Sequence, residues 1–262
     1  MNGEGIAQRS VPSRARAFGL LVHAELAAMG RNRRSLLWTT AVPVAILVLG
    51  VGQIPGHAAS RAVWAIAALA AVMGALVLGL LGYSTDLVGY RERGVFRRLR
   101  TTPVPAGLIL VVRGLAALVA IASQFVVLVA VASVVYHVHP TVGTVAGGLG
   151  AVALGGLSAI GLAQLIVART ARAQAATALA RLVLIVSLFL TGLFIRVSAW
   201  PVFWQHVAHW TPVQLAAEVL TPALQGQAWG ATQWHQAAAL GAWTLGTGVV
   251  GAVAFRWEEG DR

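Results

Sequence analysis

The sequence contains no cysteine and no lysine, and only 10% of its 262 residues are charged. The absence of cysteine excludes disulfides, thiolate metal ligands and a cysteine nucleophile. The scarcity of charge excludes an ordinary soluble domain, in which about 25% of the residues are charged. Because 58% of the residues are hydrophobic and the mean hydropathy is +0.78, the composition is that of a protein whose solvent is a lipid bilayer.

All 19 basic residues are arginine, and the chain has a net charge of +11. A basic protein often binds nucleic acid, but these arginines lie at the ends of apolar runs, as membrane topology requires. No nucleic-acid partner is therefore expected. A Walker A loop needs a lysine on the nucleotide phosphates, so this lysine-free chain cannot itself hold ATP in such a loop.

Six apolar runs are long enough to cross about 30 Å of hydrocarbon as helices. They are Leu36–Gly52, Val63–Gly82, Leu108–Tyr136, Val142–Ala168, Ala175–Ile195 and Gln236–Phe255. The runs are continuously apolar rather than alternating, and a helix satisfies its own backbone hydrogen bonds in lipid, which favours helices over barrel strands. The sequence predicts an all-α membrane protein in which residues 35–262 form a single domain of six transmembrane helices.

The arginines also predict the orientation of the chain. Seventeen of the 19 fall on the side that holds both termini, and only Arg61 and Arg196 fall on the other. Because positive residues are retained in the cytoplasm, both termini are predicted to be cytoplasmic. Six of the seven histidines, all but His23, lie in or beside the predicted outer connections. Two of these, His137 and His139, have no carboxylate or cysteine nearby, so no metal site is predicted.

Residues 1–34 precede the first span and are predicted to form a cytoplasmic arm. Apolar residues recur there at helical spacing, and basic residues lie on another face. The apolar face holds Phe18, Val22, Leu26 and Met29, and the other holds Arg16, His23 and Arg34. This pattern predicts an amphipathic helix in the cytoplasmic membrane interface. The alternative is a cytosolic arm that contacts a partner protein.

The predicted outer segment 197–235 is rich in aromatic residues and proline. It contains Trp200, Pro201, Phe203, Trp204, Trp210, Pro212, Trp229 and Trp234. Tryptophan favours the membrane interface, where its ring is buried and its N–H stays hydrated. Val213–Leu224 is predicted to form a short helix that ends near Gly226. The polar and proline interruptions predict short, half-inserted outer helices rather than a seventh span.

Spans four and six contain many glycines, which predicts close helix packing. Ser158 lies among them in a Gly-Leu-Ser-Ala stretch that is similar to that of intramembrane serine proteases of the rhomboid family. Such a protease needs a histidine on a later span to activate the serine. The later histidines all lie at or outside the outer boundary: His206, His209 and His235. The protease is therefore a minor alternative.

The strongest local signal is the basic stretch Tyr90–Val104 between spans two and three. It is predicted to form a short basic helix that ends at Pro103, and thus a rigid charged surface at the membrane. The alternative is a solvated loop whose charges only set the topology.

This stretch resembles the type-2 ABC transporter permeases, the membrane subunits of many bacterial drug, lipid and polysaccharide exporters. The matching residues are Glu92, Arg93, Gly94, Arg98, Leu99, Thr102, Pro103 and Val104. The six spans, the cytoplasmic termini, the amphipathic entry helix and the outer segment with proline and tryptophan agree with the family layout. The small size and the arginine-rich stretch look most like the daunorubicin-resistance-like drug export permeases.

The resemblance implies that segment 88–104 is a coupling segment, which receives force from a separate ATPase subunit. The implied coupling residues are Arg91, Glu92, Arg93, Gly94, Arg97, Arg98 and Leu99. Family members commonly have an acidic residue where Tyr90 and Arg97 stand and threonine where Val95 stands, so this segment is unusually basic. We expect a correspondingly acidic docking groove on the ATPase.

The resemblance also implies a substrate pathway between two permeases, chiefly along spans one, two and five. The candidate pathway residues are Thr39, Thr40, Met73, Phe189, Thr191 and Phe194. Interhelical hydrogen bonds and ordinary packing are the alternative roles of these side chains. Arg181 in span five is expected to snorkel to the cytoplasmic interface, with a buried charge as the alternative.

The predicted function is the permease subunit of an ATP-driven exporter in the bacterial plasma (inner) membrane, moving a hydrophobic or amphipathic substrate outward. No cofactor is expected in this chain, because a partner ABC ATPase subunit would bind ATP and Mg²⁺. The working unit would hold two ATPase subunits and either two copies of this chain or one copy with a similar permease. The alternative is a non-energised membrane scaffold or facilitator, which would not co-purify with an ATPase.

Overall fold

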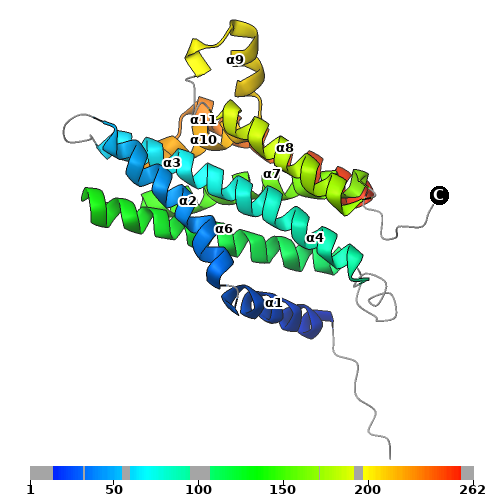
Figure 1. Ribbon diagram of the computed structural model, residues 1–262. Coiled ribbons are helices and arrows are strands. Elements are labelled where there is room, and N and C mark those ends of the chain that lie inside the picture. Colours follow the sequence, from blue (N-terminus) through cyan, green and yellow to red (C-terminus); the bar gives the residue numbers. More distant parts are fainter. Residues whose placement is uncertain are drawn as a thin grey trace, which may run out of the picture.

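The computed structural model describes residues 14–31, 33–54, 60–94, 107–170, 172–191 and 197–254. Within these ranges all regular structure is helical (Figure 1), which confirms the all-helical fold class for this part of the chain. The elements are α1 (Arg14–Arg31), α2 (Arg33–Gly52), α3 (Ser60–Leu76), the π-helical η1 (Val77–Gly82), α4 (Tyr83–Glu92), α6 (Gly107–Tyr136), α7 (Val142–Arg169), α8 (Ala173–Leu190), the 3-10 helix η2 (Val197–Ala199), α9 (Val202–His209), α10 (Pro212–Leu224) and α11 (Ala231–Ala254).

Four of the described helices are long and apolar enough to cross a membrane. They are α6, α7, α8 and the continuous helix Ser60–Glu92, which is made of α3, η1 and α4. These four coincide with predicted spans two to five. The helices α2 and α11 coincide with predicted spans one and six, although the apolar part of α2 is shorter, at Leu37–Gly52. The described helices therefore follow every predicted apolar run, and the number of six spans stays a prediction.

Local sequence signals set several helix ends. Thr141 caps α7, because its hydroxyl oxygen accepts a hydrogen bond from the backbone N–H three residues later at 3.1 Å. Thr211 caps α10 in the same way, and Pro212 takes the first position of α10, where the N–H that proline lacks is not needed. Gly226 follows α10 with a φ of +67°, a left-handed conformation that glycine adopts without strain. The short helix predicted at Val213–Leu224 is confirmed.

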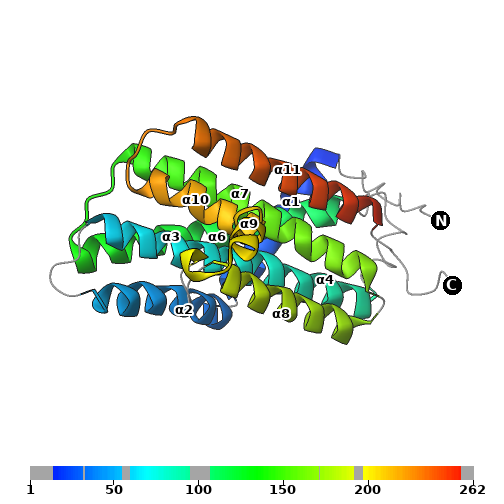
Figure 2. The ribbon, with the colours of Figure 1, turned by 90° about the horizontal axis from the view of Figure 1, so that it is seen from above.

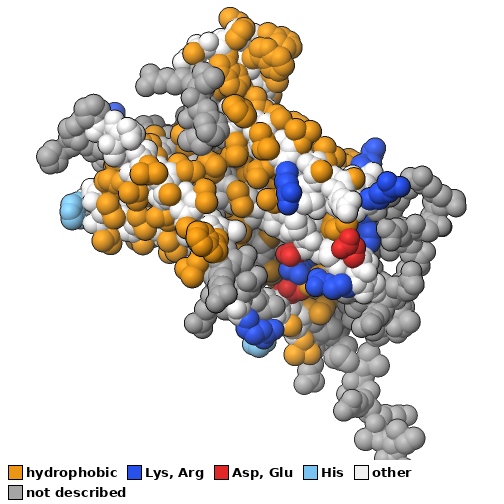
Figure 3. Space-filling view, in the orientation of Figure 1, with side chains coloured by type: hydrophobic (Ala, Val, Ile, Leu, Met, Phe, Trp, Pro, Cys, Tyr) orange, Lys and Arg blue, Asp and Glu red, His pale blue; other side chains and the backbone are white. Residues whose placement is uncertain are grey.

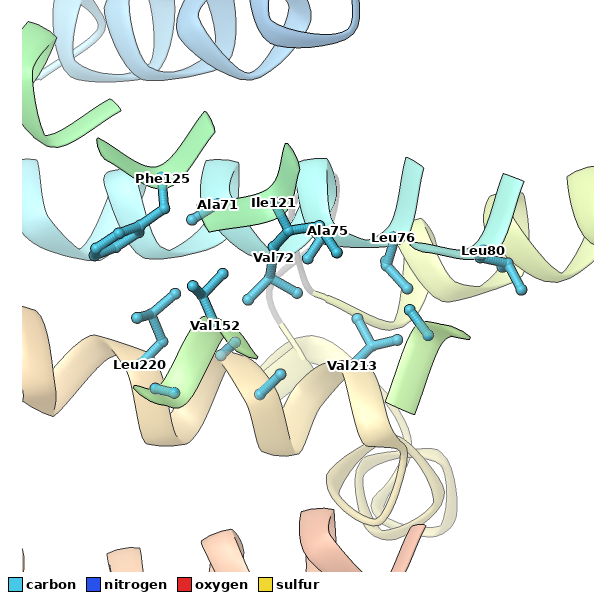
Figure 4. Close-up of a cluster of buried hydrophobic side chains, with 14 of the residues drawn as sticks. Ala71, Val72, Ala75, Leu76, Leu80, Ile121, Phe125, Val152, Val213 and Leu220 are labelled. Carbon is cyan, nitrogen blue, oxygen red and sulfur yellow. The ribbon is translucent and has the colours of Figure 1, made fainter. Parts of the chain in front are cut away.

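The helix α10 lies in the interior of the bundle, where it packs against α3, α7 and α11. Figure 4 shows side chains of α3, α6, α7 and α10 meeting in one apolar cluster, among them Val72, Phe125, Val152 and Leu220. Leu220 is fully buried. With 13 residues, α10 is too short to cross a bilayer, for which about 20 are needed. It thus fills the core without adding a span.

Glycines hold α7 against its neighbours. A Cβ atom at Gly156 would lie 2.8 Å from Ile121 Cδ1 of α6, and one at Gly161 would lie 3.1 Å from the backbone nitrogen of Gly248 on α11. Both separations are tighter than ordinary van der Waals contact, so the absence of a side chain lets these helices approach. The glycine-rich spans four and six pack closely, as the sequence predicted.

Charged side chains gather at one end of the bundle (Figure 3). We call this the charged end; there α4 and α7 finish and α6 and α8 begin. Figure 2 shows that α11 finishes at the same end. The charged end includes Arg91, Arg169 and Arg172, whereas Arg61 lies at the start of α3, at the opposite end. The helix α1 packs against α6 on the outside of the bundle (Figure 1).

Candidate functional site

A group of polar side chains joins three helices at the charged end. Arg113 on α6 lies between two carboxylates, because its Nη1 is 3.3 Å from Glu25 Oε2 on α1 and 3.0 Å from Asp86 Oδ2 on α4. The side chains of Arg113 and Glu25 are only 15% and 17% exposed, so this ion pair is shielded from much of the solvent. Removing one partner of such a shielded pair leaves the other charge unpaired, which destabilises the fold.

Tyr90 on α4 completes this group. Its hydroxyl donates a hydrogen bond to Glu25 Oε1 at 2.6 Å, and its ring lies under the guanidinium of Arg113 at 4.3 Å. A guanidinium at this distance from an aromatic face is attracted by the ring. We call Glu25, Asp86, Tyr90 and Arg113 the arginine clamp. The clamp ties α1, α4 and α6 to one another.

Arg91 ties the end of α4 to a fourth helix. Its Nη1 donates to the carbonyl oxygen of Thr170 and its Nη2 to that of Val167, both at 2.7 Å. These carbonyls belong to the last turn of α7 and its end, where a cation is favoured by the helix dipole and by carbonyls that lack a helical partner. The two helices that flank residues 95–106 are therefore both held: α4 by Arg91 and the clamp, and α6 by the clamp.

A cavity of about 360 Å³ lies beside the clamp, between α2, η1, α4, α6 and α8. Its polar lining residues are Thr39, Tyr83, Thr85, Asp86, Arg113 and Arg181. The remaining lining residues are small or aliphatic and come from η1 and α6. A space of this size falls within the range of about 300–1,000 Å³ that is typical of small-molecule pockets.

The π-helical segment η1 forms part of the cavity wall. Val77, Leu78, Leu81 and Gly82 line the cavity. On another side of η1, a Cβ atom at Gly79 would lie 2.9 Å from Ala159 Cβ of α7, so η1 is pressed against α7. Short π-helical segments are rare within α-helices and often occur at functional sites. The π-helical segment, which interrupts the α-helix of the second span, thus lies at the cavity.

The predicted coupling residues are described only in part. Glu92 ends α4, and both Glu92 and Arg93 are exposed. Gly94 follows with a φ of +64°, the left-handed conformation that commonly ends a helix. The helix of the second span therefore continues into the basic stretch Tyr90–Val104 and ends at its third residue, Glu92. Arg97, Arg98 and Leu99 lie outside the described residues, as does Pro103.

Thr39 is the predicted pathway residue that lines the cavity. Its backbone carbonyl accepts a hydrogen bond from Nε2 of Gln124 on α6 at 3.2 Å, which links α2 to α6. Gln124 is 3% exposed and packs directly against Gly74 of α3. Thr40 is partly buried on α2 and does not line this cavity.

The other predicted pathway residues lie elsewhere. Met73 is buried on α3, and Phe189 is half-exposed on α8. Thr191 is buried just after α8, where its hydroxyl donates to the carbonyl of Leu188 at 2.6 Å. Phe194 lies outside the described residues. The structure does not bring Met73, Phe189 and Thr191 into the cavity that Thr39 lines.

Sequence reasoning missed the arginine clamp and two further polar residues that line the cavity, Tyr83 and Thr85. One signal could have found the clamp: between Gly5 and Trp257 the sequence has only four acidic residues. They are Glu25, Asp86, Glu92 and Glu218. A carboxylate in or beside an apolar helix needs a partner, so each of these acids predicts a nearby base or donor.

Ser158, the candidate nucleophile of the protease alternative, has a packing role. Its hydroxyl oxygen lies 2.7 Å from that of Thr244, and its own hydroxyl can donate to the carbonyl of Leu240 at 3.4 Å. Ser158 is 2% exposed. These bonds join α7 to α11 and account for the polar side chain as interhelical contact.

The fold and the site define a class, the multi-pass helical membrane proteins with a polar cluster beside a basic segment. Residues 16–224 match the family model described as ABC-2 type transporter, and the chain belongs to this family. It is therefore a permease component of an ABC transporter, which confirms the predicted type-2 permease; the daunorubicin-resistance-like subtype stays a prediction. The family implies an ABC ATPase as partner. A comparison with curated proteins found no match.

Proposed function

We propose that the chain is the permease of an ATP-driven exporter, and that it moves a hydrophobic or amphipathic substrate out of a bacterial cell across the inner membrane. Six helices would span the bilayer. With a rise of about 1.5 Å per residue, the 20 residues of α2 and the 24 of α11 extend about 30 and 36 Å, enough for the hydrocarbon core. The gathering of arginine at the charged end supports a cytoplasmic position for that end and for both termini.

The observation that carries the proposal is how the helices flanking residues 95–106 are held. Arg91 and the arginine clamp connect α4 and α6 to α1 and α7. A force on the segment between α4 and α6 would therefore move four helices together instead of bending a free loop. This is the mechanical property that a coupling segment needs.

ATP hydrolysis is assigned to a separate subunit, because this chain has no lysine for a Walker A loop. Arg93, Arg97, Arg98 and Leu99 would dock in an acidic groove of that subunit, with Glu92 pairing with a partner arginine. ATP and Mg²⁺ would bind there and close the ATPase pair. The resulting push would tip the helices from an inward-open to an outward-open state.

The proposed pathway lies between two permeases, in which α2 and α8 face the second subunit. One face of α8 carries a stripe of exposed apolar side chains at helical spacing: Leu182, Ile185, Val186 and Phe189. A second copy of the chain, or a similar permease, would cover this stripe. Thr39, Thr40, Met73, Thr191 and Phe194 would then lie along or behind the pathway.

The experiment is co-purification in mild detergent with the ABC ATPase subunit coexpressed, using charge reversals at the two ends of the bundle. Arg97→Glu combined with Arg98→Glu should abolish co-purification and stimulation of ATP hydrolysis. Arg61→Glu is the control, because Arg61 lies at the opposite end. Unchanged binding in the double variant would contradict the coupling assignment. Failure of the wild-type chain to retain any ATPase would favour the non-energised scaffold or facilitator.

A further inference from the structure

Arg181 is a cation within the apolar helix α8, in the half nearer the charged end. It is the ninth of the 18 residues of α8, which is apolar enough to span the bilayer. Its side chain is exposed and lines the cavity beside the arginine clamp. Within the described residues, no hydrogen bond or ion pair involves its guanidinium. Charged residues at such positions are costly and mark ligand or ion pathways.

The second arginine of the cavity differs from Arg181 in its partners. Arg113 is engaged by Glu25 and Asp86 and stacks on Tyr90, so its charge is already compensated. Arg181 therefore offers the cavity a cation that is available to a ligand. Asp86 lines the same cavity and is 52% exposed, which leaves a carboxylate that accepts hydrogen bonds from hydroxyl or amine groups of a ligand.

The rest of the cavity suits an apolar chain. Its apolar wall is formed by side chains of η1 and α6: Leu78, Leu81, Ala116, Ala117 and Ala120. A guanidinium that has no partner among the described side chains, and that lies next to a wall of this kind, is complementary to a molecule with an anionic head and a hydrocarbon tail. Guanidinium groups bind phosphate and carboxylate oxygens by paired, charge-assisted hydrogen bonds.

We propose that this cavity binds the head group of an anionic amphiphile, with its phosphate or carboxylate at Arg181 and its apolar tail along η1 and α6. As an account of the exported substrate, this rests on the proposed function. The proposal that the cavity binds such a molecule depends only on the geometry and charge of the cavity.

The test uses the purified full-length chain and two lipid probes with identical acyl chains, anionic phosphatidylglycerol and zwitterionic phosphatidylcholine. Native mass spectrometry counts the lipids that stay bound. The wild type should prefer phosphatidylglycerol, and Arg181→Gln should lower its occupancy about tenfold, the factor that one charge-assisted hydrogen bond supplies. Arg181→Lys should restore much of the binding, because it restores the charge.

Arg172→Gln is the matched control, because it removes an exposed arginine just before the same helix and outside the cavity. Equal occupancy in Arg181→Gln and wild type would overturn the site. Equal losses in Arg181→Gln and Arg172→Gln would overturn it too, since they would show a general effect of surface charge. Retained binding by a chain that holds no ATPase would leave the site standing and reject only the proposed function.

An experiment on the assembled transporter distinguishes an exported amphiphile from a resident membrane lipid. If ATP releases bound phosphatidylglycerol and the lipid reaches the outer leaflet, the site belongs to the export pathway. If the lipid stays bound through turnover, the site holds a resident membrane lipid. Both results keep the anionic head group at Arg181.

Discussion

The helices α7 and α8 follow each other in the chain, yet their surroundings are opposite. In the apolar stretch of α7, 61% of the residues are buried, whereas only 17% of α8 is buried. The sequence of α7 contains seven glycines and that of α8 contains none. Glycine lets α7 contact its neighbours closely, while α8 presents large aliphatic side chains to the outside. Two equally apolar runs thus encode an internal helix and a surface available to a partner.

The largest expected effect comes from filling a glycine contact of α7. Gly161→Ala places a methyl group against Thr247 and the backbone of Gly248, so α7 and α11 must separate. Overpacking of this kind costs about 2 kcal/mol, and at this chain length it lowers the melting temperature by about 5 °C. Thermal unfolding in detergent measures it. Gly150→Ala is the control, since a Cβ there meets nothing within 4 Å. Equal melting temperatures of Gly161→Ala and Gly150→Ala would show that α7 is not tightly packed.

The second effect is at the arginine clamp, where α6 meets α1 and α4. Arg113→Gln leaves Glu25 and Asp86 without their cation. Because Asp86 is half-exposed, we expect a loss of only about 1–2 kcal/mol in the free energy of unfolding. In the assembled complex, the permease should stimulate ATP hydrolysis by the ATPase subunit. This stimulation should fall several-fold more in Arg113→Gln than in Arg172→Gln. If the two variants behave alike in both assays, the clamp does not transmit force.

The smallest effect concerns the exposed face of α8. Leu182→Ala with Ile185→Ala should leave the melting temperature of the monomer unchanged, because both side chains are about half-exposed. Dimerisation in bilayers, counted by single-molecule photobleaching, should weaken about tenfold if these side chains are buried in the partner. The matched pair is Val249→Ala with Val253→Ala on α11, which are also exposed. If the double variant on α11 loses more dimers than the double variant on α8, the dimer interface lies at α11 instead.

Much of the fold could be predicted because apolar runs and capping residues act locally. The predicted run Leu108–Tyr136 corresponds to the helix Gly107–Tyr136, and the predicted run Val142–Ala168 corresponds to the helix Val142–Arg169. The helix at Val213–Leu224 was also predictable, since Thr211 and Pro212 mark its start. Helix ends and apolar periods need no information from distant parts of the chain.

The candidate site was harder to predict because its contacts join distant residues. Tyr90 and Glu25 are 65 positions apart, and Arg91 and Thr170 are 79 apart. A single sequence shows that Glu25 and Asp86 need partners but does not say which arginine serves them. The π-helical segment η1 was missed for a similar reason, because its register follows from packing against α7 and not from a local motif.

The central claim is that the charged end faces the cytoplasm, where an ATPase can act on the segment between α4 and α6. The chain has no cysteine, so Arg97→Cys and Arg61→Cys each introduce a single reactive thiol. A membrane-impermeant maleimide should label Arg61→Cys in intact cells and Arg97→Cys only in inverted membrane vesicles. Labelling of Arg97→Cys in intact cells would contradict the claim.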